Sequence, residues 1–326
     1  MLVVAVSTAL AQSSAASSKR GLAAHSPRGP GVGAARKSSG PGPLRGKKLV
    51  RTSHRLASVS GRQRSRPWHG FDSLRLSGGQ GQPQARELTV YLPKGYGDDP
   101  NRTYPVLYMQ DGQNVFEYGP AGFGNGWDIA TSMEKEVAEG RAEPAIIVAI
   151  FNDAVDRIGE YATISRDVEM GGSSIHVKGR ADRYVDYVAD VVRPHIEARY
   201  LTRAGRGSTA LGGSSMGGLV SIHGALRRPD VFGKVLASSP SLWFDKGIID
   251  RAAASDAPLD LYLDNGGVGA EGDNAPHVDR LRDAMQKRRA ATGKGNVWHS
   301  FDANAGHTEA AWRERFPGAF SALFAR

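Results

Sequence analysis

Residues Gly213 to Gly217 form a Gly-x-Ser-x-Gly set with Ser215 at its centre. The stretch before it, residues 208–211, is expected to be a short strand, and residues 217–226 are expected to be a helix. A serine on such a strand-to-helix turn is held in a strained conformation with its hydroxyl exposed, as a nucleophile requires. The flanking glycines let the backbone bend tightly. The backbone N–H of Met216 would then lie at a helix N-terminus, where it can stabilise a developing oxyanion.

A serine nucleophile needs a base, and the position of His307 fits that role. In hydrolases whose nucleophilic serine lies on such a strand-to-helix turn, the chain order is serine, acid and histidine, with the last two on loops after later strands. His307 follows an expected strand at residues 297–301 and precedes an expected C-terminal helix. The other histidines lie in the N-terminal region, before Ser215, or inside expected helices and strands. We therefore expect His307 to be the general base.

The acid that orients this histidine should follow the preceding strand, expected at residues 259–263. Three candidates lie in the glycine-rich stretch that comes next: Asp264, Glu271 and Asp273. Glu271 is preferred and Asp273 is the alternative, because a flexible loop could bring either to His307. The stretch also contains a Gly-x-Gly-x-x-Gly pattern at residues 267–272. It stands late in the chain, with no acid at a strand end about 20 residues on, so we expect no dinucleotide site.

The second oxyanion donor should come from the loop after an earlier strand. That loop is residues 110–114, where Gly112 permits close approach of the backbone and the N–H of Gln113 is the candidate. The sequence has no pair of His, Asp or Glu with metal-ligand spacing and no phosphate-binding loop. Because there is no cysteine, thiolate catalysis, disulfides and cysteine-based zinc sites are excluded. The expected chemistry needs no metal and no cofactor.

The elements that must position these groups alternate between strand and helix. Residues 104–109 and 145–150 are apolar runs typical of parallel strands buried on both faces, whereas residues 87–92 alternate like an edge strand. Residues 184–199 have helical spacing, with a kink expected at Pro194. Further strands are expected at 234–237, 259–263 and 297–301. The pattern predicts an α/β fold whose mostly parallel sheet is covered by helices on both faces.

The charge is unevenly distributed along the 326 residues. Residues 1–71 hold 13 of the 42 Lys and Arg residues and none of the 33 acids, so the remainder is mildly acidic. This Ser-, Ala-, Gly- and Arg-rich segment cannot bury enough surface to offset its ordering entropy, so we expect a disordered basic arm before a catalytic domain at 72–326. An export or organelle signal is the favoured role, and an upstream start codon is a further reading. A nucleic-acid-binding tail is disfavoured, because Trp68 and Phe71, at its end, are its only aromatics. The chain has no apolar run long enough to span a membrane.

Residues from about 86 to 326 resemble the putative-esterase family of α/β-hydrolases, which includes feruloyl, acetyl-xylan and enterochelin-type esterases, S-formylglutathione hydrolases and mycolyl transferases. The resemblance rests on six stretches that occur in the family's order: 90–93, 108–116, 157–161, 213–218, 239–243 and 306–312. It implies an α/β-hydrolase fold with Ser215 as nucleophile, His307 as base and an acid in the loop after Leu263. It also implies that Trp127, Trp243 and Trp312 lie near the cleft, although large aromatic residues are more often part of the core.

The sequence thus predicts a serine carboxylic-ester hydrolase that works through an acyl-enzyme, in one domain without a large separate lid. The expected substrate is a small-molecule or carbohydrate-linked ester. An acyltransferase would use the same residues with an alcohol acceptor in place of water. A non-catalytic binding module on the same fold would not need the order serine, acid, histidine, which is intact here.

Overall fold

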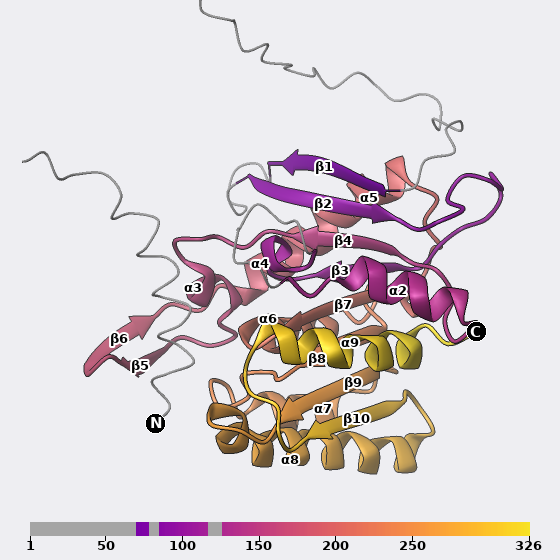
Figure 1. The fold of residues 1–326 in the computed structure, drawn as a ribbon. Helices are drawn as coiled ribbons and strands as arrows, with labels where there is room; N and C mark the ends of the chain where they lie inside the picture. The colour runs from indigo at the N-terminus through magenta and orange to yellow at the C-terminus, as the bar shows by residue number, and fades with distance from the viewer. Residues whose placement is uncertain (1–69, 78–84, 117–125) are drawn as a thin grey trace, which may run out of the picture.

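The structure is a computed structural model that describes residues 70–77, 85–116 and 126–326. Its central feature is one eight-stranded sheet (Figure 1). Its strand order is β1-β2-β4-β3-β7-β8-β9-β10. All pairs from β4 to β10 are parallel, and β2 is antiparallel to both β1 and β4. The strands are β1 Gly70–Leu76, β2 Arg86–Leu92, β3 Val106–Met109, β4 Ile146–Ile150, β7 Thr209–Ser214, β8 Lys234–Ser238, β9 Asp260–Gly266 and β10 Val297–Asp302.

Helices cover both faces of this sheet. They are α2 Ile129–Ala138, α3 Arg157–Tyr161, α4 Ala181–Tyr187, α5 Arg193–Arg199, α6 Met216–Arg227, α7 Ile248–Ala254, α8 Ala270–Thr292 and α9 Glu309–Leu323, with short turns η1 Gly112–Asn114, η2 Val188–Val192 and η3 Arg206–Ser208. In Figure 1, α2 and α9 lie side by side across one face. The predicted α/β fold with a mostly parallel sheet is therefore confirmed.

Two hydrophobic clusters lie on opposite faces of the sheet, because successive strand residues point to opposite sides. Val106 and Tyr108 of β3 belong to the larger cluster, with α4, α6, α7 and α8. Leu107 and Met109 belong to the smaller cluster, with α2 and α9. Every residue of β4 is buried, so this strand is apolar throughout. The two-sided burial fixes the register that brings the carboxyl ends of the parallel strands to one edge.

The structure corrects three of the expected elements. Residues 87–92 are not an edge strand: β2 lies inside the sheet, and β1, which begins at Gly70, forms the edge beyond it. The expected helix at 184–199 is present, but it contains the π-helical turn η2 between α4 and α5 instead of a simple kink at Pro194. Pro194 follows that turn and lacks the N–H that would have bonded to the carbonyl of residue 190.

The third correction concerns the glycine-rich stretch that carries the candidate acids. It was expected to be a flexible loop from residue 264 to 274, but β9 runs on to Gly266 and α8 begins at Ala270. Only three residues separate the strand from the helix. Glu271 and Asp273 are therefore in the first turn of a long helix, and Asp264 is part of the strand.

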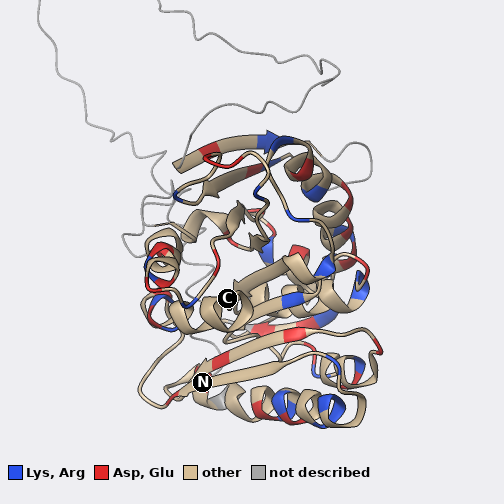
Figure 2. Cartoon of the chain, turned by 90° about the vertical axis from the view of Figure 1, so that its right-hand side faces the viewer, with Lys and Arg blue, Asp and Glu red and all other residues tan. Residues whose placement is uncertain are grey.

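A two-stranded hairpin, β5 Arg166–Met170 and β6 Ser173–Val177, projects from the body beside α3 and was not expected (Figure 1). Elsewhere, charges of both signs are interspersed on the helices (Figure 2), as in the pair Arg227–Asp186. No helix among the described residues combines the length and apolar character needed to cross a bilayer. The boundary predicted after residue 71 is two residues too late, because Gly70 and Phe71 already pair with β2 as part of β1. The other predictions for the basic arm stay predictions, since residues 1–69 lie outside the described part.

Candidate active site

Ser215 occupies a sharp turn between β7 and α6 at the carboxyl edge of the sheet. Its backbone has φ 57° and ψ −124°, a region that non-glycine residues rarely adopt. Its N–H donates to the carbonyl of Ser238 at 3.0 Å, which ties the turn to β8. A Cβ at Gly213 would lie 2.9 Å from the backbone of Gly217, so the turn requires glycine there. The strained serine turn predicted from the sequence is therefore present.

Two loops bring the predicted oxyanion donors to the same edge. Met216 opens α6, and N–H groups in a first helical turn have no partner within the helix. Gln113 lies in η1, directly after β3, and its side-chain oxygen accepts the N–H of Asn152 at 3.4 Å. A Cβ at Gly112 would lie 2.7 Å from the backbone of β4, so only glycine allows this turn to pack against the sheet.

Arg157 is a charged group of this edge to which the sequence reasoning gave no role. Its guanidinium makes two hydrogen bonds to the Asp111 carboxylate, at 2.6 and 2.7 Å. Asp111 precedes η1, the turn that carries Gln113, and has a left-handed φ of 56°. The side-chain amide of Asn152 also donates to the Asp111 carboxylate, at 2.6 Å. A Cβ at Gly217 would lie 3.0 Å from the Asp111 carboxylate, so the ion pair lies directly against the start of α6. The sequence signal was the matching stretch at residues 157–161.

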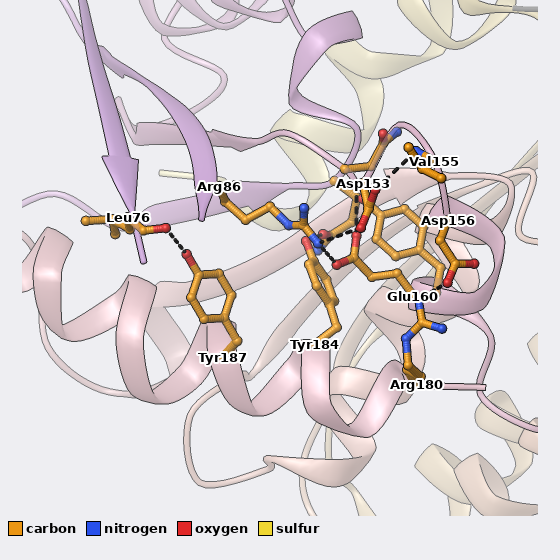
Figure 3. A network of polar contacts seen from close by, with 12 residues as sticks. Leu76, Arg86, Asp153, Val155, Asp156, Glu160, Arg180, Tyr184 and Tyr187 are labelled. Carbon is orange, nitrogen blue, oxygen red and sulfur yellow. Dashed lines mark hydrogen bonds and ion pairs between the residues drawn. The ribbon is translucent and has the colours of Figure 1, made fainter. Parts of the chain in front are cut away.

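A buried polar cluster holds the short helix that carries Arg157 (Figure 3). Glu160, which is 4% exposed, is paired with Arg86 of β2 and accepts the N–H of Asp153 at 3.1 Å. Tyr161 accepts the N–H of Asp111 at 3.2 Å, and Tyr184 is hydrogen-bonded to Gln110. Burial raises the pKa of Glu160 although Arg86 opposes the shift. The cluster thus connects β2, α3 and α4 to residues 110 and 111, which precede the turn η1.

His307 and Glu271 are in direct contact. His307 lies between β10 and α9, and its Nδ1 is 2.8 Å from Oε1 of Glu271, whose other carboxylate oxygen accepts the N–H of Gly266 at 3.3 Å. Burial alone would raise the pKa of the fully buried Glu271, but the hydrogen bond and charge of His307 outweigh it and the pKa is lowered. Of the three candidate acids, Glu271 is the one for which the structure gives a contact with His307.

Asp264 is engaged elsewhere. Its carboxylate accepts from Arg315 of α9 at 3.0 Å and from the Ser238 hydroxyl at 2.8 Å. Complete burial raises the pKa of Asp264 to about 6, against the opposing charge of Arg315. Asp273 is placed only by its backbone, in the first turn of α8.

Ser239 lies behind Glu271 and joins it to the last helix. The Ser239 hydroxyl accepts from the indole N–H of Trp312 at 2.9 Å and from Arg315 at 3.2 Å. Because the indole and the guanidinium can only donate, the Ser239 hydroxyl proton is free to form a hydrogen bond of its own. It donates to the Glu271 carboxylate, and this hydrogen bond lowers the pKa of Glu271. The Trp312 ring also meets the His307 ring edge to face, with centroids 4.9 Å apart.

The tryptophans expected near the cleft differ in exposure. Trp127 and Trp312 are 3% and 5% exposed and their rings pack against each other, so both occupy core positions. Trp243 is partly exposed and packs on Phe244. A role in substrate binding stays a prediction, and Trp243 is the one of the three with solvent access to support it.

The glycines of the Gly-x-Gly-x-x-Gly pattern have a packing role. A Cβ at Gly267 would lie 2.7 Å from the carbonyl of Ala303, and one at Gly272 would lie 2.8 Å from that of Gly267. A Cβ at Gly266 would lie 2.1 Å from the carbonyl of Ala305, two residues before His307. The glycines let this segment approach the base loop closely. No group of three or more His, Asp or Glu that could hold a metal ion occurs in the described part of the chain.

Ser215 is hydrogen-bonded to a second serine. Its Oγ is 3.1 Å from Oγ of Ser241, and no hydrogen bond joins Ser215 to His307 in the described structure. The candidate nucleophile, the candidate base with the carboxylate that contacts it, and the two candidate amide donors all lie near the carboxyl ends of the parallel strands. Groups of these types, gathered at the carboxyl ends of the strands, can carry out acyl transfer.

Comparisons with known proteins find esterases among the relatives of this chain. A family model described as putative esterase matches residues 80–323. The endo-1,4-beta-xylanase/feruloyl esterase of Xylanibacter ruminicola is 31% identical over 151 residues, 44% of this chain and 18% of that protein. The iron(III) salmochelin esterase of Escherichia coli O6:H1 is 24% identical over 257 residues, 74% of this chain and 54% of that protein. The chain spans less than two thirds of the length of the curated relatives it matches.

Solved structures show the same fold. An IroE-like serine hydrolase from Shewanella oneidensis superimposes with a TM-score of 0.64 at 23% identity, covering 78% of this chain and 80% of that one. This similarity supports the α/β-hydrolase architecture.

Proposed function

Because this chain belongs to the putative esterase family, we propose that it is a serine carboxylic-ester hydrolase that works through an acyl-enzyme. The observation that carries the proposal is the 2.8 Å contact between His307 and Glu271, at the edge of the sheet where Ser215 sits on its strained turn. A histidine whose Nδ1 is occupied by a carboxylate has Nε2 available as a base.

In the proposed acylation step, Ser215 Oγ attacks the ester carbonyl and its proton moves to Nε2 of His307. Glu271 holds the imidazole in the required tautomer and stabilises the imidazolium that forms. The N–H groups of Met216 and Gln113 donate to the oxyanion. His307 then returns the proton to the leaving alcohol. Water repeats the sequence on the acyl-enzyme and releases the acid.

The proposed substrate is a small-molecule ester, which can be linked to a carbohydrate. The names of the relatives support this class, since they refer to siderophore esters and to feruloyl esters. The partly exposed Trp243 is a proposed contact for the substrate.

The experiment that tests the proposal is an assay with nitrophenyl esters of graded chain length and with feruloyl and acetyl-sugar esters. Wild-type protein should hydrolyse the short activated esters, and Ser215→Ala should lower kcat by about 10⁴-fold or more. Unchanged turnover in a folded Ser215→Ala protein would refute the nucleophile assignment. Added acceptor alcohols separate hydrolysis from acyl transfer, because a transferase forms the new ester at the expense of the free acid.

A further inference from the structure

Ser241 is a buried hydroxyl group in contact with the proposed nucleophile. It follows β8, is 4% exposed, and its Oγ lies 3.1 Å from Oγ of Ser215. Its backbone N–H donates to the carbonyl of Ser215 at 3.0 Å, and its own carbonyl accepts the N–H of Phe244 at 3.0 Å. The backbone on both sides of Ser241 is therefore held against the Ser215 turn, which keeps the two hydroxyl groups within reach of each other.

The direction of the serine–serine hydrogen bond follows from counting protons. Each hydroxyl has one proton and two acceptor positions. When Ser215 gives its proton to Nε2 of His307, the hydrogen between the two serine oxygens has to come from Ser241. In the described structure, Ser241 Oγ has no hydrogen-bond partner other than Ser215. No competing acceptor therefore draws the Ser241 proton away from the nucleophile.

We propose that Ser241 is a further catalytic residue, whose hydroxyl donates to Ser215 Oγ and assists its departure when the acyl-enzyme is hydrolysed. This inference rests on the acyl-enzyme mechanism proposed above. In that step, water attacks the acyl carbonyl and gives a proton to Nε2 of His307. The tetrahedral intermediate then collapses, the bond from carbon to Oγ breaks, and its electron pair goes to Oγ. His307 returns its proton to Oγ, so that the acid and the free Ser215 hydroxyl are formed.

The two chemical steps depend on this hydrogen bond to different degrees. In the free enzyme, Ser215 Oγ is an alcohol oxygen and already accepts the Ser241 proton, so the bond changes little during acylation. In the acyl-enzyme, Oγ is an ester oxygen whose lone pair is delocalised into the carbonyl, which makes it a poor acceptor. The bond regains strength as negative charge returns to Oγ. Only an interaction that is stronger in the transition state than in the ground state accelerates a step, so Ser241 should act on deacylation.

The experiment compares Ser241→Ala with wild type on a nitrophenyl ester, whose good leaving group makes deacylation rate-limiting. Losing one hydrogen bond to a developing charge should lower kcat about 10-fold. KM should fall by the same factor, so kcat/KM should stay within about twofold of wild type. Intact-mass spectrometry during turnover, at a substrate concentration below the wild-type KM, should show a larger fraction of acylated protein in the variant.

Ser221→Ala is the matched control. Ser221 is also a fully buried serine, one turn along α6, and its hydroxyl donates to the carbonyl of Gly217 at 2.7 Å and not to the nucleophile. The same substitution there should leave both the kcat and the acylated fraction near wild type. If Ser241→Ala does not fold, Ser241→Cys keeps an unbranched side chain with a weak donor at its end, and its kcat should lie between that of wild type and a tenfold loss.

Three outcomes overturn the inference. An unchanged kcat in Ser241→Ala shows that the hydroxyl does not assist deacylation. If Ser241→Cys is used instead, a kcat equal to that of wild type shows the same. A fall in kcat/KM that comes from a raised KM at unchanged kcat shows that it acts on acylation instead. A wild-type enzyme that hydrolyses the ester without forming a Ser215 adduct overturns the acyl-enzyme itself and, with it, this role of Ser241. The adduct measurement thus separates failure of the inference from failure of the proposed function.

Discussion

Replacing Glu271 by glutamine tests the proposed acid with the least change of shape. The wild-type carboxylate can only accept, so it selects the imidazole tautomer that carries its proton on Nδ1, at 2.8 Å. A glutamine amide can turn its N–H₂ group toward Nδ1, which favours the other tautomer and places the proton on Nε2. An imidazole in that form cannot take the proton of Ser215. In a serine protease the equivalent change lowers kcat about 10⁴-fold, so we expect a loss of about 10³–10⁴ here.

The assay is kcat on a short nitrophenyl ester, with Asp273→Asn as the control. Asp273 lies two residues further along the first turn of α8, so both changes remove one negative charge from the same helical turn. Asp273→Asn should cost far less activity. If the order of the two losses is reversed, the role of acid moves to Asp273. Near-normal activity in both variants would refute the triad and leave a Ser215–His307 dyad or a role for Asp264.

The same variant has a pH signature in its stability. The pKa of Glu271 in the folded protein is lowered, so its charge contributes to stability above the pKa of an unfolded glutamate, about 4.3. That contribution is lost as the pH falls through the lower pKa of the folded state. Glu271→Gln lacks it at every pH and loses a charged hydrogen bond worth about 1.5–3 kcal/mol. Urea unfolding should therefore show a difference between wild type and variant near neutral pH that shrinks in acid, and a constant difference would contradict the pairing with His307.

Two further predictions concern the N-terminal region and acid stability. A chain that begins at Gly70 should match the full-length protein in kcat, and an inactive Gly70 chain would show that residues 1–69 contribute to function. A chain that begins at Asp72 lacks the half-exposed Phe71 ring, which packs on Tyr91 and Phe116. Its free energy of unfolding in urea should be lower by about 1 kcal/mol. Burial, and then the charge of Arg199, lower the pKa of His195 to about 4, so the unfolded chain binds more protons between about pH 6.5 and 4 and stability is lost as the pH falls through that window. His195→Gln should therefore show a flatter dependence of Tm on pH in that range, and an equal slope would indicate that His195 is not the responsible group.

The parts of the site that the sequence predicted are those carried by local pattern. The glycines around Ser215 need only neighbours within the same turn, so the strand, the turn and the helix could be predicted together. His307 could be predicted from its place after the last strand. The strand positions followed from apolar runs, because a strand buried on both faces reads as continuous hydrophobic sequence.

The parts that escaped prediction depend on contacts between distant segments. The stretch after Leu263 reads as a flexible loop because of its glycines, but those glycines are required by the backbone of residues 303 and 305, about 40 positions away. The same is true of Arg157, whose partner Asp111 is 46 positions earlier. β2 alternates like an edge strand, and only the pairing with β1 makes it internal. Spacing within a segment carries no information about such partners.

The connection of Ser239 to the last helix has a consequence for how the protein can be switched off or damaged. Trp312 and Arg315, both on α9, supply the two hydrogen bonds that orient the Ser239 hydroxyl. A helix that packs on one face of a sheet can open locally at a lower free-energy cost than the strands inside the sheet. When α9 detaches, Ser239 loses both donors and His307 loses the ring against its face, while the sheet and the Ser215 turn stay in place. Activity then depends on the docking of α9 rather than on global stability, so partial heating or limited proteolysis within α9 should abolish turnover before the sheet unfolds.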